Sequence, residues 1–123
     1  MAVANAGYES EGPEVVIPVR VAERLGLWPK LPEGMEVQAY EVAGGLKVRS
    51  YVIEDCLEVQ VVAGDAASDP VRTAAVVMEG ESEILLSDAS ISAHRIVIED
   101  PKRGLWRFRG EEKLRRSESP EYW

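Results

Sequence analysis

Apolar and polar positions alternate in short runs along this chain, and turn residues separate the runs. Apolar and polar residues alternate from Met35 to Ala39, Tyr40 and Val42 continue on the opposite parity, and Gly44-Gly45 follows directly. A Gly-Gly connection allows the positive φ angles that tight hairpin turns require. We therefore expect Met35–Ala43 and Leu46–Ile53 to pair as antiparallel strands.

The later apolar runs have the length of strands rather than helices. Further strands are expected at Leu57–Val61, Val71–Met78, Ile84–Leu86, Ile96–Ile98 and Leu105–Phe108. Helical patterns are confined to Val19–Leu27 and to one or two turns ending at Ala93, capped by Ser87 or Asp88. Short strands at a spacing of about 8–12 residues favour an all-β fold, a closed barrel or a sandwich, with one or two short helices.

The length of 123 residues corresponds to one domain. We expect the domain over residues 1–108 and a charged tail over residues 109–123, because the strand pattern fades after Phe108. No apolar run approaches the ~20 residues needed to cross a bilayer, so no membrane partner is expected. The first residues lack the basic and apolar regions of a secretory signal, which predicts a cytoplasmic protein.

The net charge of −8 is unevenly distributed. Residues 1–101 hold 7 Lys/Arg against 18 Asp/Glu, whereas residues 102–123 hold 7 Lys/Arg against 4 Asp/Glu. The basic tail contains aromatic residues, as nucleic-acid-binding segments do, but its glutamates interrupt the patch and the acidic body repels phosphate. Nucleic acid is therefore not the expected partner.

Few residues are suited to metal or nucleophilic chemistry. Cys56 and His94 are the only cysteine and the only histidine, so no zinc cage forms within one chain, and we expect no metal or other cofactor. Ser87, Asp88 and His94 offer the residue types of a serine hydrolase, but no Gly-x-Ser-x-Gly elbow accompanies them. We expect His94 to be a partly exposed residue at a helix end.

Several elements occur in an order that resembles a known family. The segment Asn5-Ala6-Gly7-Tyr8 is followed by a strand and helix over Val15–Leu27, a hairpin at Ala43-Gly44-Gly45, and an apolar strand ending at Leu86 before a short helix. This order resembles the retropepsin-like aspartic peptidases whose active-site motif reads Asp-Thr-Gly-Phe. The resemblance covers most of the chain from Ala2 to Phe108 and implies a retropepsin-like fold.

In that family two chains meet on a two-fold axis, and each supplies one catalytic aspartate. The resemblance therefore implies a homodimer, with the tail as a segment that could pack at the dimer interface. Two adjacent carboxylates share a proton, which lets one activate water and the other donate. Here Asn5 stands in the aspartate position, and an amide cannot act as a general base. Ala6 lacks the hydroxyl of the family threonine, and Ser87 replaces a glycine of the second element, so we expect impaired catalysis.

Three functional hypotheses follow from this resemblance. The first is a catalytically impaired homodimer that keeps a peptide-binding groove, with the degenerate site at Asn5, Ala6 and Gly7. The groove would be lined by Tyr8, Ala43, Gly44, Gly45, Leu86 and Ser87. The second is an active endopeptidase that uses a substitute carboxylate, such as Asp88, Glu9 or Glu11, or a deamidated Asn5. The third is an interaction domain whose function does not involve the groove.

Overall fold

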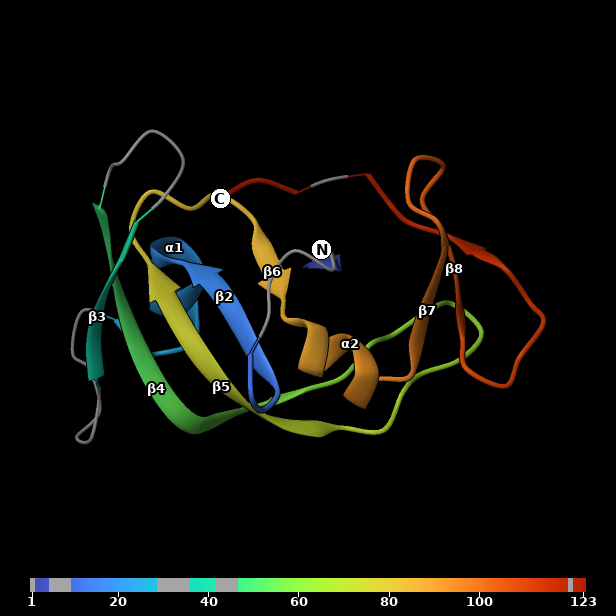
Figure 1. The fold of residues 1–123 in the computed structure, drawn as a ribbon, viewed down its shortest axis with the longest axis horizontal. Coiled ribbons are helices and arrows are strands. Elements are labelled where there is room, and N and C mark those ends of the chain that lie inside the picture. Colours follow the sequence, from blue (N-terminus) through green and yellow to red (C-terminus); the bar gives the residue numbers. More distant parts are fainter. Residues whose placement is uncertain (1, 5–9, 29–35, 42–46, 120) are drawn as a thin grey trace.

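The computed structural model describes residues 2–4, 10–28, 36–41, 47–119 and 121–123. In these residues the chain forms a six-stranded sheet, a three-stranded sheet and two short helices (Figure 1). The predicted all-β character, with few and short helices, is confirmed.

The larger sheet has the strand order β1-β6-β2-β5-β4-β3. Its strands are β1 (Ala2–Ala4), β2 (Glu14–Pro18), β3 (Glu36–Glu41), β4 (Lys47–Val59), β5 (Val71–Met78) and β6 (Ile84–Leu86). β1 pairs with β6 in parallel, β6 with β2 antiparallel, and β2 with β5 in parallel. Among the described strands none joins β1 to β3, so the sheet is open and the expected closed barrel is not found.

The hairpin predicted around Gly44-Gly45 is confirmed in its strands, which pair antiparallel from Glu36↔Val52 to Glu41↔Lys47. The two glycines themselves lie outside the described residues. The strand expected separately at Leu57–Val61 is largely the continuation of β4. A register shift between Ile53 and Leu57 interrupts the pairing of β4 with β5, and Asp55 there has a positive φ of 47°.

Side chains of consecutive residues point to opposite faces of a strand, and the register aligns them into two rows across the sheet. One row contains Leu86, Val15, Ala75 and Ile53, and the opposite row contains Leu85, Val16, Val76 and Val52. The first row forms the main core together with Val21 and Ala22 of the helix α1 (Val19–Arg24). The second row forms a smaller apolar cluster with Met78.

Helix α1 is shorter than the range predicted to Leu27. Gly26 has a φ of +76°, and the Leu27 amide donates to the Ala22 carbonyl at 2.9 Å. This is the glycine-terminated helix end in which a left-handed residue closes the last turn. Leu27 and Trp28, which follow this turn, pack against the main core.

Helix α2 (Asp88–Ala93) leads into the second sheet, which contains β7 (Ile96–Asp100), β8 (Leu105–Phe108) and β9 (Arg115–Arg116). The side chain of Arg115 is 8% exposed and bonds to Asp65 and Glu111 at 2.8 and 2.9 Å. Lys113 also bonds to Asp65 at 2.8 Å. These cations hold the pKa of Asp65 well below its usual range. Two basic residues of the tail are therefore paired within the chain.

The end of the tail returns to the larger sheet, as Figure 1 shows. The Trp123 amide donates to the Ser82 carbonyl at 2.9 Å, and its indole packs against the main core. The Arg24 guanidinium lies 4.9 Å from the centre of the indole ring. The tail thus contacts the core of its own chain, and its contribution to a dimer interface stays a prediction.

Replacing Trp123 tests whether this contact stabilises the fold. We expect Trp123→Ala to lower the free energy of unfolding by about 2 kcal/mol, because a large, partly buried apolar surface is lost. Trp123→Phe should cost much less, since the indole Nε1 is buried without a hydrogen-bond partner among the described residues. Urea unfolding measures both variants. Tyr122→Ala, at a side chain that is 68% exposed, is the control, and an equal loss there would contradict the role of Trp123.

Candidate functional site

The candidate site lies where β1 and β6 end side by side. Asn5, Ala6, Gly7, Tyr8, Ala43, Gly44 and Gly45, all predicted site residues, lie outside the described residues. The structure describes what flanks the first four: β1 up to Ala4, and the chain again from Ser10. Ala4 is in parallel register with Leu86. Ser87 therefore follows β6 at the end of the sheet where the chain leaves β1.

Two buried serines hold the start of β2 against the start of α2. Ser87 and Ser90 are both 0% exposed. The backbone N–H of Glu14 donates to Ser90 Oγ at 2.9 Å and to Ser87 Oγ at 3.2 Å, while Ser90 Oγ donates to the Glu14 carbonyl at 2.7 Å. Ser87 Oγ also accepts from the Ser90 amide at 3.2 Å, which makes Ser87 the helix N-cap. Of the two predicted caps, the structure selects Ser87.

Asp88 connects the segment after the predicted site turn to the same helix. Its Oδ1 accepts the Ser10 N–H at 2.9 Å and the Ala89 N–H at 2.7 Å. A carboxylate oxygen bound by two backbone donors positions the loop that begins at Ser10. The role of Asp88 as a substitute catalytic carboxylate stays a prediction.

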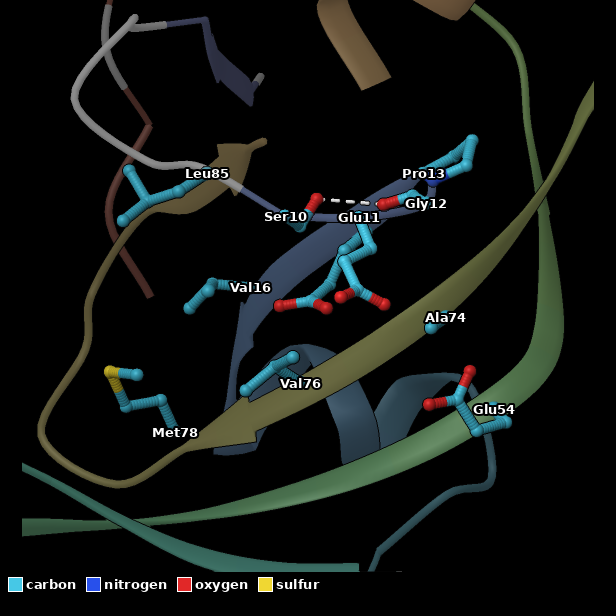
Figure 2. A pocket seen from close by; sticks show the side chains of 11 residues that line it. Ser10, Glu11, Gly12, Pro13, Val16, Glu54, Ala74, Val76, Met78 and Leu85 are labelled. Carbon is cyan, nitrogen blue, oxygen red and sulfur yellow. Dashed lines mark hydrogen bonds between the residues drawn. The ribbon is translucent and has the colours of Figure 1, made fainter. Parts of the chain in front are cut away.

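A cavity of about 540 Å³ opens beside this loop, on the sheet face that carries the smaller apolar cluster. Figure 2 shows Ser10, Glu11, Gly12 and Pro13 on one side, Glu54 on the other and Ala74 between them, with Val16 and Val76 beside them. The full lining is Ser10, Glu11, Gly12, Pro13, Glu14, Val16, Glu54, Ala74, Val76, Met78 and Leu85. The cavity thus has an apolar floor from three strands and an acidic rim.

The register explains which residues line the cavity. Leu86, predicted to bind ligand, belongs to the main core, whereas its neighbour Leu85 faces the cavity from the opposite side of β6. Glu14 and Glu54 line the cavity but were not among the predicted site residues. The run Val15-Val16-Ile17 carried a signal for this face, because apolar residues at consecutive positions of a strand indicate that both faces are covered.

The described hydrogen bond of the His94 ring goes to neither Ser87 nor Asp88, the other two residues of the serine hydrolase considered above. The His94 ring is 1% exposed, so the expected partial exposure is wrong, and Nδ1 is hydrogen-bonded to Ser68 Oγ at 3.0 Å. Ser87 instead bonds to Ser90 and Glu14. His94 Nε2 is buried and has no partner among the described residues. The sequence could not show this burial, because it depends on the distant loop that carries Ser68.

Cys56 lies in an apolar environment that does not favour reactivity. Cys56 packs partly buried against the main core, and this burial raises the pKa of its thiol, which disfavours the reactive thiolate. Within the described ranges, no three or more His, Cys, Asp or Glu side chains gather in an arrangement that could hold a metal ion. No helix in this part of the chain is both long and apolar enough to cross a membrane.

Comparison of the chain with protein-family models, with curated proteins and with solved structures finds no match in any of the three.

Replacing Ser87 tests the buried serine pair. We expect Ser87→Ala to lower the free energy of unfolding by about 1–2 kcal/mol, because a helix cap and a buried acceptor for the Glu14 amide are lost together. Thermal and urea unfolding measure the change. Ser92→Ala, at an exposed position of the same helix, should change stability by no more than about 0.5 kcal/mol. Equal effects at the two serines would contradict the assigned role.

The burial of His94 predicts a dependence of stability on pH. Desolvation lowers the pKa of His94 below its ordinary value of 6.5, so the unfolded chain binds a proton more readily than the folded chain. The stability from neutral His94 is fully present above pH 6.5 and is lost as the pH falls from 6.5 through the folded-state pKa. Because His94 is the only histidine, NMR titration of its ring reports this pKa directly. His94→Gln should flatten the stability profile in this window, and a folded-state pKa at or above 6.5 would refute the explanation.

Proposed function

We propose that this chain is the subunit of a homodimeric, aspartic-peptidase-like protein that binds extended peptide in a groove and does not cleave it efficiently. The proposal joins the order of sequence elements around Asn5-Ala6-Gly7-Tyr8 to the arrangement of the described strands. It is a binding function on a peptidase scaffold.

The observation that carries the proposal is the position of β6 between β1 and β2. The family resemblance implies that the second element, here Ile84–Leu86 with Ser87, approaches the active-site turn. The parallel pairing of Ala4 with Leu86 and the bond from the Ser10 amide to Asp88 support this proximity from both sides of the turn. The cavity begins at Ser10, two positions after Tyr8. A ligand in the cavity would therefore lie next to the segment that carries Asn5.

The chemistry of Asn5 is the reason for proposing binding without efficient cleavage. A two-fold axis through the family's site brings the same residue of both chains together. Two amides can hydrogen-bond to each other or to a peptide, but neither removes a proton from water. The scaffold would thus keep its affinity for extended chains.

Restoring the carboxylate tests this proposal. We expect the unaltered protein to bind members of a peptide library and to cleave them slowly or not at all, at acidic and at neutral pH. Asn5→Asp together with Ala6→Thr should raise the cleavage rate by at least about a hundredfold, the usual contribution of a general base. Ser92→Asp adds a carboxylate at an exposed position elsewhere and should leave the rate unchanged.

The assembly is measured in the same samples. Light scattering after size exclusion should give twice the chain mass of 13.6 kDa. A monomer would contradict the proposed dimer. Rapid cleavage by the unaltered chain that an aspartic-peptidase inhibitor blocks would contradict the impaired site and favour the substitute-carboxylate hypothesis.

A further inference from the structure

We propose that the cavity beside Ser10 selects a lysine or arginine side chain of the bound peptide. The apolar stem of that side chain would lie on the floor formed by Val16 and Val76, and its cationic group would lie among the carboxylates of the rim. The inference rests on the proposed peptide-binding function and adds the chemistry of the ligand.

The floor of the cavity is apolar because three strands present the same face to it. Val16 and Val76 are paired residues of β2 and β5, and Leu85 of β6 is the partner of Val16 on the other side. Ala74 and Met78 lie two positions before and two positions after Val76 on β5 and extend this surface. A methylene chain placed here would replace water over apolar side chains, which is favourable.

Three glutamates of the lining lie around a small residue. Ala74 is the register partner of Glu14 on β2, and on its other side Glu54 follows Ile53, the partner of Ala75. The single methyl group of Ala74 leaves room between the two glutamates, and Glu11 approaches from the loop after Ser10. Figure 2 shows Ala74 between the loop and Glu54. Three acidic side chains therefore surround one end of an apolar floor.

Two carboxylates of this rim, those of Glu11 and Glu54, are not neutralised by the basic residues that the structure describes. Glu11 and Glu54 are exposed, and neither forms an ion pair with a described residue. Arg72, Arg107, Lys113 and Arg115 are paired with other acids. The whole chain carries a net charge of −8, which adds to the attraction for a cation.

A lysine or arginine side chain matches both parts of the cavity. These side chains lay a flexible apolar stem along apolar surface and keep a charged group at the end, where it can meet carboxylates. A purely apolar side chain would leave Glu11 and Glu54 without a partner, and an acidic one would be repelled. Complementarity of charge and shape thus favours a basic peptide.

Peptides that differ at one position test the inference. Fluorescently labelled peptides of equal length would carry Lys, Arg, Met or Glu at a central position in an otherwise neutral, apolar sequence. Fluorescence anisotropy would measure their dissociation constants at low and at physiological ionic strength. We expect the Lys and Arg peptides to bind about three- to tenfold more tightly than the Met peptide at low salt, and the Glu peptide to bind most weakly.

Two double variants test whether the preference for a basic side chain comes from the cavity. Glu11→Gln with Glu54→Gln should reduce the affinity for the Lys peptide to that for the Met peptide and leave the Met peptide unchanged. Glu23→Gln with Glu58→Gln removes the same charge from exposed positions outside the cavity and should preserve the preference. All four glutamates are exposed, so the variants should fold.

The outcomes separate the inference from the proposed function. Equal affinity for all four peptides would overturn the basic preference and leave the peptide-binding function standing. An equal loss of preference in both double variants would assign it to the overall charge and overturn the cavity as its source. If no peptide of any sequence binds, the proposed function fails and the inference fails with it.

Discussion

The arrangement of the site depends on the three-residue strand β6, because this strand is paired with a neighbour on each side. It joins β1 in parallel and β2 antiparallel, and it ends directly at Ser87. Without it, β1 would have no partner among the described strands, and the start of α2 would lose its position relative to Glu14. The buried bonds of Ser87 and Ser90 then fix the loop that begins at Ser10. The cavity and its acidic rim depend on that loop.

Local sequence pattern predicted much of the secondary structure and little of the pairing. Alternation and Gly44-Gly45 were enough for the hairpin, since its strands are neighbours in the sequence. The same pattern divided β4 into two strands, because the polar pair Glu54-Asp55 interrupts the apolar run where the register with β5 shifts. In the structure, Asp55 absorbs the change through a positive φ, and Arg72 binds its carboxylate at 3.0 Å. Nothing in the local sequence indicated that β1 would lie at the edge of the sheet formed by the described strands.

For the candidate site, the sequence predicted the helix cap but not the cavity. Ser87 has the side chain and position of an N-cap, so its role could be predicted from the next three residues. Which of Leu85 and Leu86 faces the cavity depends on the register with β2, and consecutive leucines do not encode it. Glu14 and Glu54 were not among the site residues predicted from the sequence, and the strand pairing places them on either side of Ala74. Such juxtapositions come from strands far apart in the chain.

The pairing of β1 with β6 has a consequence for the order of folding. The bond between Ser10 and Asp88 spans 78 positions, whereas the hairpin of β3 and β4 closes over a few residues. Closing a long loop costs entropy before its contacts form, so distant pairings are slow. We expect the hairpin to form early and the ends of β1 and β6 to meet late. The part of the molecule that holds the loop beside the cavity would then be the last to be completed, and it would be missing from an early kinetic intermediate.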